Sequence, residues 1–279
     1  MQNAEVERPD RPLRSPYDGF HSAGFSGSRF DQVLLTGADF YKVRLDDAHF
    51  RDVDLRGLDV RDAVITGKLR GIELWDVELS GDIGRLVVNG VEVGTYVEAE
   101  LDRRMPERVL MRPADPDGFR TGFATIERLW DGTVARARTF PPEALHRSVD
   151  GEWSFIQTLR HLGFATACWV GMALGDPNPW HPYDLPWDQA PGWDDVPWDR
   201  EMQPSLDEVL AVRAERRALI HAVLDMLTQN ELDRVVSPIA NGHPPETVPV
   251  AKCLRVVLNE EWEHRLYAER DLTAIEEEN

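Results

Sequence analysis

The first regular pattern along the chain is a period of five between about residues 30 and 65. A large apolar residue recurs for eight cycles, and a second set of mostly small or β-branched residues stands two positions before each. The large residues are Phe30, Leu35, Phe40, Leu45, Phe50, Leu55, Val60 and Ile65. Helices repeat about every 3.6 residues and strands every 2, so neither explains this spacing. The pattern instead indicates a short solenoid whose turns stack on one another.

The period of five ends near residue 68, where an alternating pattern takes over. It runs to Asn89-Gly90, which stands between β-branched residues and is a strong signal for a two-residue hairpin turn. We expect this hairpin to cap the repeats. A short helix from Tyr96 and several prolines then indicate a linker. The expected parts are a flexible segment 1–25, a repeat domain 26–95 with its hairpin cap, a helix and linker 96–114, and a helical domain 115–279.

Helical periodicity dominates the rest of the chain, in four segments of similar length. One of them opens with Ser205 and Glu208, the pattern of a capping box. The four segments are roughly 118–138, 153–170, 206–228 and 248–270. They predict an up-down four-helix bundle, so that the fold class is α+β in two domains.

His161 lies in the second helical segment on an otherwise core-like face. Ser154, Gln157, Ala165, Cys168 and Met172 fall within roughly 40° of it on a helical wheel. These small, thin or soft side chains leave space in front of the imidazole, which a metal or a substrate needs. A lone helical histidine is more often a hydrogen-bonded core or surface residue, so this segment alone does not decide between the two interpretations.

Glu260 and His264 lie one turn apart in the last helical segment, on a stripe with Val250, Cys253 and Val257. A carboxylate and an imidazole at i and i+4 can point at one ion. With His161 from a facing helix they would supply three ligands and leave a coordination position open, as in catalytic zinc sites. The competing interpretation is a solvated acidic face formed by Glu260, Glu261 and Glu263. The wheel favours Glu260 only narrowly over Glu261.

The connection 175–204 is unusually long for a compact domain, and it is rich in tryptophan, proline and aspartate. Loops of this length are either functional or disordered, and disordered segments are poor in aromatic residues. We therefore expect it to cover the mouth of the site, or else to shield one side of the bundle. His181 and Tyr183 within it are candidates for substrate contact.

Composition limits the functions that the chain can have. The net charge of −19 disfavours nucleic acid and anionic membranes as partners, because phosphate contacts need clustered Lys and Arg. No stretch is apolar enough for a signal peptide or a membrane span, which predicts a cytoplasmic protein. The two cysteines, Cys168 and Cys253, lie in predicted helices and are interpreted as core residues without a disulfide.

Two segments resemble known families. The motifs WSFIQTLRHLGFAT and NEEWEHRLYAER, about a hundred residues apart, resemble the DinB-like superfamily, which includes enzymes akin to maleylpyruvate isomerase and the bacillithiol transferases. The resemblance covers roughly residues 115–272 and implies a four-helix bundle with His161, Glu260 and His264 as ligands of a divalent metal, zinc or nickel. The repeats resemble the pentapeptide-repeat family, which implies a right-handed β-helix of only about two coils.

The resemblance implies a metal-dependent enzyme that uses a low-molecular-weight thiol as cosubstrate. A transferase, isomerase or hydrolase acting on a small molecule is the reaction class expected. The alternative is a binding protein, because acidic pentapeptide-repeat proteins can imitate duplex DNA. Two coils would span only about 10 Å at roughly 4.8 Å per layer, which is short for such a mimic. A third interpretation is a metal-free bundle whose repeats mediate assembly, and a homo-oligomer is left open.

Overall fold

A computed structural model describes residues 28, 30, 33, 35, 37–38, 40, 43–51, 53, 55–60, 63–81, 83–171, 179–187, 197–237 and 247–278. The chain divides into two compact units, Met1–Trp75 and Asp76–Asn279. The predicted segment 1–25 lies outside the described residues. Within the described ranges, no helix combines the length and the hydropathy that a membrane span requires.

The described part of the first unit contains tight turns ten residues apart. The backbone N–H groups of Ala38 and Ala48 donate to the carbonyls of Leu35 and Leu45 at 3.0 and 3.1 Å, which closes two β-turns. Left-handed φ values recur at ten-residue intervals, at Gly37, Asp47, Gly57 and Gly67. A left-handed third residue is what a type II turn requires. The apolar residues of the period-five phase are at least half exposed, and the described part of this unit contains no assigned strand. The β-helix therefore stays a prediction.

The predicted hairpin is present and belongs to the second unit. Strands β1 (Val87–Val88) and β2 (Val91–Glu92) pair antiparallel, with Val88 opposite Val91. Asn89 and Gly90 both have positive φ, as a type I′ turn requires. Its role as a cap on the repeats stays a prediction. Helix α1 (Gly94–Arg104) and the 3₁₀ helix η1 (Pro106–Met111) follow it.

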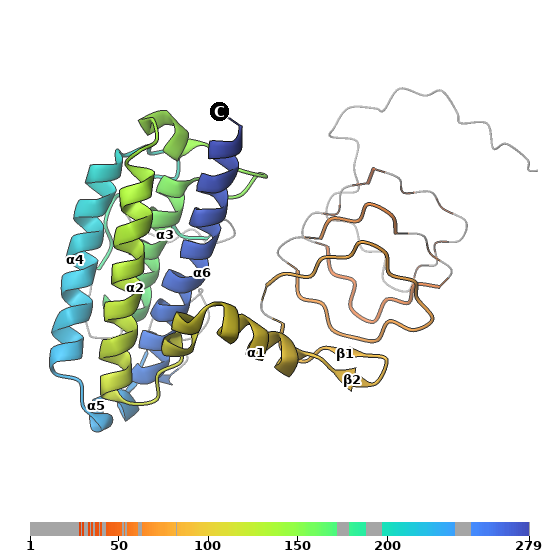
Figure 1. The fold of residues 1–279 in the computed structure, drawn as a ribbon, viewed down its shortest axis with the longest axis horizontal. Coiled ribbons are helices and arrows are strands. Elements are labelled where there is room, and N and C mark those ends of the chain that lie inside the picture. Colours follow the sequence, from red (N-terminus) through yellow and green to blue (C-terminus); the bar gives the residue numbers. More distant parts are fainter. Residues whose placement is uncertain are drawn as a thin grey trace, which may run out of the picture. The chain divides into compact units, whose positions relative to one another are not determined.

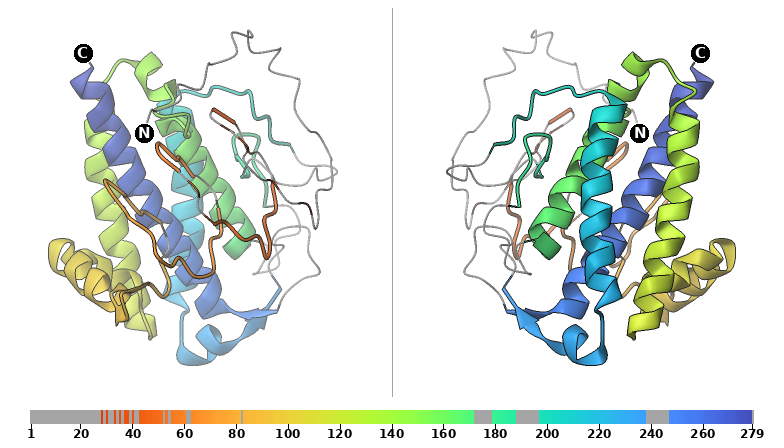
Figure 2. Two further views of the ribbon diagram at one scale, coloured as in Figure 1. Left: turned by 90° about the vertical axis from the view of Figure 1, so that its right-hand side faces the viewer. Right: turned by 90° about the vertical axis from the view of Figure 1, so that its left-hand side faces the viewer.

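The second unit is built from four long helices packed side by side (Figures 1 and 2), which confirms the predicted helical segments. Ser154 and Ser205 each form a capping box at the start of α3 and α4, with Gln157 and Glu208 as the reciprocal partners. The helices are α2 (Pro116–Ala137), α3 (Phe155–Thr166), α4 (Leu206–Asp225) and α6 (Val250–Glu277).

Shorter elements complete this unit. Strands β3 and β4 pair antiparallel, with Val236 opposite Val248. These elements are η2 (Pro142–His146), the π-helical turn η3 (Ala167–Gly171) that continues α3, α5 (Gln229–Asp233), β3 (Val235–Val236) and β4 (Val248–Pro249).

The core lies between the four helices and consists of large apolar side chains. It buries Phe119, Phe123, Ile126, Trp130, Leu159, Leu162, Ile220, Leu254, Val257, Leu258 and Leu272, among others. Burying a single side chain of this size contributes roughly 1.5–3 kcal/mol. Packing of these stripes therefore fixes the rotation of each helix, including which face of α3 and α6 turns toward the other.

The up-down order expected for the bundle is wrong in one respect, because α3 and α4 run in the same direction (Figure 1). Arg120 at the start of α2 donates to the carbonyls of Leu224 and Leu227 at the end of α4, so these two helices are antiparallel. Arg136 at the end of α2 reaches Glu276 at the end of α6, so that pair is parallel. The connection between α3 and α4 is long enough to return along the bundle, which a short loop could not do.

Candidate metal centre

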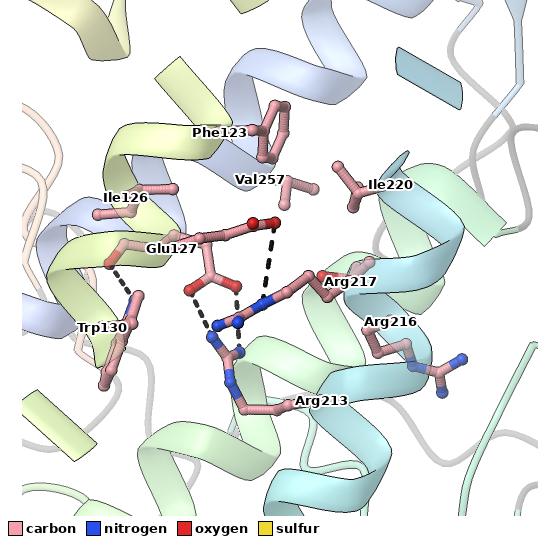
Figure 3. A pocket seen from close by; sticks show the side chains of 11 residues that line it. Phe123, Ile126, Glu127, Trp130, Arg213, Arg216, Arg217, Ile220 and Val257 are labelled. Atoms are coloured by element: carbon pink, nitrogen blue, oxygen red, sulfur yellow. Dashed lines mark hydrogen bonds and ion pairs between the residues drawn. The ribbon is translucent and has the colours of Figure 1, made fainter. Parts of the chain in front are cut away.

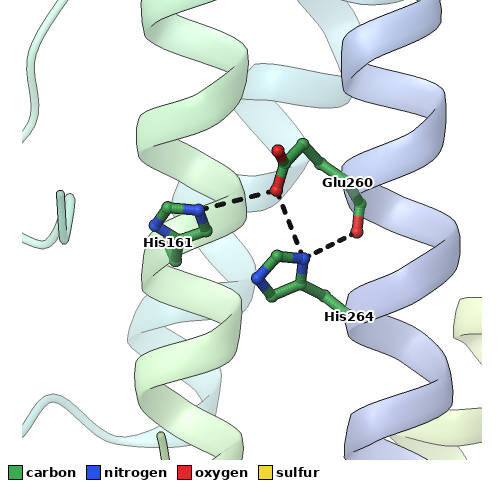
Figure 4. Close-up of side chains that lie close together, drawn as sticks. All are labelled: His161, Glu260 and His264. Atoms are coloured by element: carbon green, nitrogen blue, oxygen red, sulfur yellow. Dashed lines mark hydrogen bonds and ion pairs between the residues drawn. The ribbon is translucent and has the colours of Figure 1, made fainter. Parts of the chain in front are cut away.

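His161, Glu260 and His264 converge where α3 crosses α6 (Figure 4). The two helices are antiparallel neighbours, and Glu260 and His264 stand one turn apart on α6, facing the middle of α3. One possible ligand atom from each residue lies within 4.8 Å of the other two, which makes this a group that could hold a metal ion. The sequence-based expectation that these three side chains come together is therefore met by the geometry.

The Glu260 carboxylate lies between the two imidazoles. Its Oε2 atom is 3.6 Å from Nε2 of His161 and 3.3 Å from Nδ1 of His264. The ring centroids of the two histidines are 5.0 Å apart, and their planes differ by 27°. No permanently charged cation touches this carboxylate within the described part of the chain, so its nearest partners are groups that can be neutral.

A backbone carbonyl lies beside Nδ1 of each imidazole, and in His264 this nitrogen also faces the Glu260 carboxylate. His161 Nδ1 lies 3.0 Å from the carbonyl oxygen of Leu185, and His264 Nδ1 lies 2.9 Å from that of Glu260. A carbonyl oxygen only accepts, so Nδ1 of each ring carries a proton, and in the neutral form of the ring Nε2 has the free lone pair. Hydrogen bonds of this kind fix the tautomer and orientation of metal-binding histidines.

Burial and the neighbouring charges set the protonation of the group. His161 is buried, whereas the side chains of Glu260 and His264 are 30% and 17% exposed. Burial raises the pKa of Glu260, but the hydrogen bond with His161 and the charges of both imidazoles outweigh it, so the pKa is lowered. Burial and then repulsion from His161 lower the pKa of His264, against the opposing effect of Glu260. An ionised carboxylate beside a neutral imidazole is the combination that binds a metal.

A comparison with family models agrees with this arrangement of helices and side chains. The model of the DinB superfamily matches residues 125–268, just over half of the 279 residues. The chain belongs to the DinB superfamily. A second model, for pentapeptide repeats, matches residues 20–67 with eight copies. Neither the curated proteins nor the solved structures contain a significant match.

Aromatic rings border the candidate centre of this DinB domain. Trp153 lies 4.4 Å from the ring of His161 and stacks on His264 at 6.0 Å and 23°. Phe164 and Tyr267 add ring contacts at 6.0 and 6.1 Å to His161 and His264. The sequence predicted small, thin or soft side chains around His161, and one of them, Met172, lies outside the described residues. Trp153 was missed because it precedes the N-cap of α3, where a helical wheel no longer gives the direction of a side chain.

Glu261 is excluded from the centre by a partner on another helix. Its carboxylate accepts two hydrogen bonds from Arg213 of α4, at 3.0 and 2.7 Å, and both side chains are nearly buried. The indole N–H of Trp130 donates to its backbone carbonyl at 3.1 Å. The structure thus resolves the narrow choice between Glu260 and Glu261 in favour of Glu260 as the carboxylate beside the histidines.

Arg213 and Glu261 line a pocket between α2, α4 and α6 (Figure 3), which is separate from the candidate centre. The other charged groups at this pocket are also paired. Arg217 lies 3.3 Å from Asp131, and Glu127 lies 3.1 Å from His221. Neither of the two histidines nor Glu260 lines it. We interpret this pocket as part of the ion-paired packing of the bundle.

The two loop residues expected to contact substrate, His181 and Tyr183, contact each other and α4. His181 Nδ1 accepts from the backbone N–H of Tyr183 at 3.1 Å, and the Tyr183 hydroxyl donates to Glu208 at 3.0 Å. Their rings contact each other, with centroids 5.0 Å apart. In the described part of the loop these contacts organise the chain, and none of them is with the candidate ligands. A role for His181 and Tyr183 in substrate binding stays a prediction.

Proposed function

We propose that the DinB domain binds one divalent metal ion, zinc or nickel, through His161, Glu260 and His264. The observation that carries this proposal is the convergence of three ligand atoms within 4.8 Å, with Nδ1 of both imidazoles engaged by carbonyls. Three protein ligands leave coordination open for a substrate, whereas closed structural sites use four. Zinc or nickel is proposed because the family resemblance implies these ions, and two imidazoles and a carboxylate suit both.

We further propose that the reaction is thiol-dependent transfer, isomerisation or hydrolysis of a small molecule. When bound, a divalent ion lowers the pKa of a coordinated thiol or water and polarises a carbonyl group. The protein's own thiols are unsuited to the role of nucleophile. Burial raises the pKa of Cys168 to about 12 and that of Cys253 to about 11, so both stay protonated near neutral pH. A thiol cosubstrate would therefore have to enter from solution.

The residues around the centre would orient such a substrate and limit its contact with water. The rings of Trp153 and Phe164 lie 4.4 and 6.0 Å from that of His161. The Glu260 carboxylate, 3.6 and 3.3 Å from the two imidazoles, is the one negative charge among the proposed ligands. It would leave a net positive centre when a divalent ion is present, which favours a thiolate.

For the first unit we propose a short right-handed β-helix of pentapeptide repeats. Eight matched copies and tight turns at every second pentapeptide support it. With about two coils, such a unit would depend on neighbouring structure for stability, because each coil stacks only on the next.

The proposed reaction is tested with purified protein, zinc or nickel, a panel of low-molecular-weight thiols and an electrophilic haloarene. We expect at least one thiol to be consumed faster with the metal-loaded wild type than with Glu260→Gln or with chelated protein. Equal rates in all three samples, for every thiol, would contradict the thiol-dependent reaction while leaving metal binding to be judged by direct measurement.

A further inference from the structure

Arg160 is a fully buried arginine that precedes His161 in α3 and points away from the candidate centre. Only 2% of the residue is exposed. Its guanidinium donates to the carbonyls of Tyr183 and Met202 at 2.8 and 2.6 Å, to that of Arg200 at 3.3 Å, and to that of Asp199. Four of the five N–H groups of the Arg160 guanidinium therefore donate to loop carbonyls.

These acceptors come from both described stretches of the long connection between α3 and α4. Tyr183 belongs to 179–187, and the other three belong to 197–204. Among the described residues no side chain accepts from Arg160, so its guanidinium joins two separate stretches of loop backbone to α3. Burial lowers the pKa of Arg160, and the nearby carboxylates of Asp199 and Asp184 oppose that effect.

The same loop also contacts the candidate metal ligand His161, through Leu185, which stands two residues after Tyr183. The N–H of Leu185 donates to the backbone carbonyl of Arg160 at 3.3 Å, and the Leu185 carbonyl lies 3.0 Å from Nδ1 of His161. The preceding loop residue, Asp184, is buried and pairs with Arg216 at 3.0 Å. Its other oxygen would lie 3.0 Å from a Cβ built on Gly163, so the loop lies directly against α3.

We propose that Arg160 is a positioning residue, which holds the loop so that the Leu185 carbonyl orients His161 for metal binding. This inference rests on the proposed metal site. Arg160 touches neither His161's Nε2 nor Glu260, and its effect passes through the backbone of the loop. Loss of an outer hydrogen-bond partner of a metal-binding histidine typically weakens metal affinity by roughly 10- to 100-fold.

Arg160→Met tests the proposal, because methionine keeps apolar bulk and removes the N–H groups. Arg120→Met is the matched control. Arg120 also donates to two backbone carbonyls, those of Leu224 and Leu227, but at the opposite end of α4 from the loop. Zinc affinity is measured by competition with a chelator, at a temperature at which circular dichroism shows each variant to be folded. Destabilisation by itself then leaves the affinity unchanged, since nearly all molecules are folded.

We expect Arg160→Met to bind zinc roughly 10- to 100-fold more weakly than wild type, and Arg120→Met to stay within about 3-fold. Amide hydrogen exchange gives a second result. Zinc should slow exchange in the peptide 179–187 in wild type and in Arg120→Met, but not in Arg160→Met, because the loop and the metal would share His161.

Three results would overturn the proposal: wild-type affinity in Arg160→Met, equal losses in both variants, or no effect of zinc on exchange of 179–187 in wild type. The exchange measurement on wild type can overturn the proposal even if Arg160→Met does not fold. A wild type that binds no zinc would instead contradict the proposed function itself, and the role of Arg160 with it.

Discussion

Two neighbouring carboxylates on α6 have opposite surroundings. Glu261 faces α4 and accepts two hydrogen bonds from Arg213, a side chain that is charged at every relevant pH. Glu260 faces α3 and has two imidazoles as its nearest partners. One residue of helix rotation thus separates a carboxylate with a permanent countercharge from one without.

The difference indicates which side of α6 is structural and which is available to a ligand. A buried charge is stable only when it is paired and hydrogen-bonded, and Arg213 provides this for Glu261. Glu260 is more exposed, and its partners among the described residues are two imidazoles, which carry a countercharge only when they are protonated. The carboxylate on the pocket side of α6 therefore already has its countercharge, whereas the side that faces α3 has the donors of a metal site.

The largest effect should come from removing an imidazole. We expect His161→Ala and His264→Ala to weaken zinc binding by more than the roughly 100-fold that damage to outer partners can cause. His221→Ala is the matched control, since His221 pairs with Glu127 on the pocket side. Chelator competition measures all three. If His161→Ala or His264→Ala bound zinc as tightly as wild type, the substituted histidine would not be a metal ligand.

Glu261→Gln should act on folding and not on metal. Removing one charge of a buried pair leaves the other uncompensated, so we expect the free energy of unfolding to fall by roughly 3–5 kcal/mol in urea denaturation. Zinc affinity should stay within about 3-fold of wild type when the protein is folded. A Glu261→Gln variant that is as stable as wild type but no longer binds zinc would contradict this, because it would make Glu261 a metal ligand and not a structural residue.

Glu260→Gln should show the converse behaviour. We expect zinc affinity to fall roughly 10-fold or more, because an anionic donor is lost from the ligand set. The free energy of unfolding should change by less than about 1 kcal/mol, since Glu260 has no permanently charged partner among the described residues that the change would leave unpaired. Strong destabilisation without loss of zinc would make Glu260 a structural residue like Glu261.

Acidity should weaken zinc binding gradually. Imidazoles bind only when neutral, so protons compete as the pH falls. The pKa of His264 is lowered, chiefly by burial, so this residue stays neutral to a lower pH than an ordinary histidine with a pKa of about 6.5. We therefore expect affinity to be nearly constant from about pH 8 to 6.5 and to fall below that. A rise in affinity on acidification would contradict imidazole ligands.

Much of this comparison could be predicted from the sequence, because it depends on helical spacing. Glu260 and His264 share a stripe of α6 by their four-residue separation, and His161 stands on a periodic segment of its own. Ser205 and Glu208 located the start of α4 to within a residue. Spacing also ranked Glu260 above Glu261, but only narrowly, because a wheel does not show which helix each side faces.

Other features of the structure leave no pattern in the sequence. The parallel direction of α3 and α4 depends on the end of the bundle at which the long connection between them arrives, and the length of the connection does not determine this. The four acceptors of Arg160 and the partner of His161 Nδ1 are backbone carbonyls, which every residue has. Their arrangement follows from the path of the loop, which a helical wheel does not describe.

The metal content of the purified wild-type protein tests the central claim most directly. Native mass spectrometry and elemental analysis should find about one divalent ion per chain, and Glu260→Gln combined with His264→Ala should find none under the same conditions. A wild-type protein that carries no metal and takes up neither zinc nor nickel on titration would contradict the account of His161, Glu260 and His264 as a metal site.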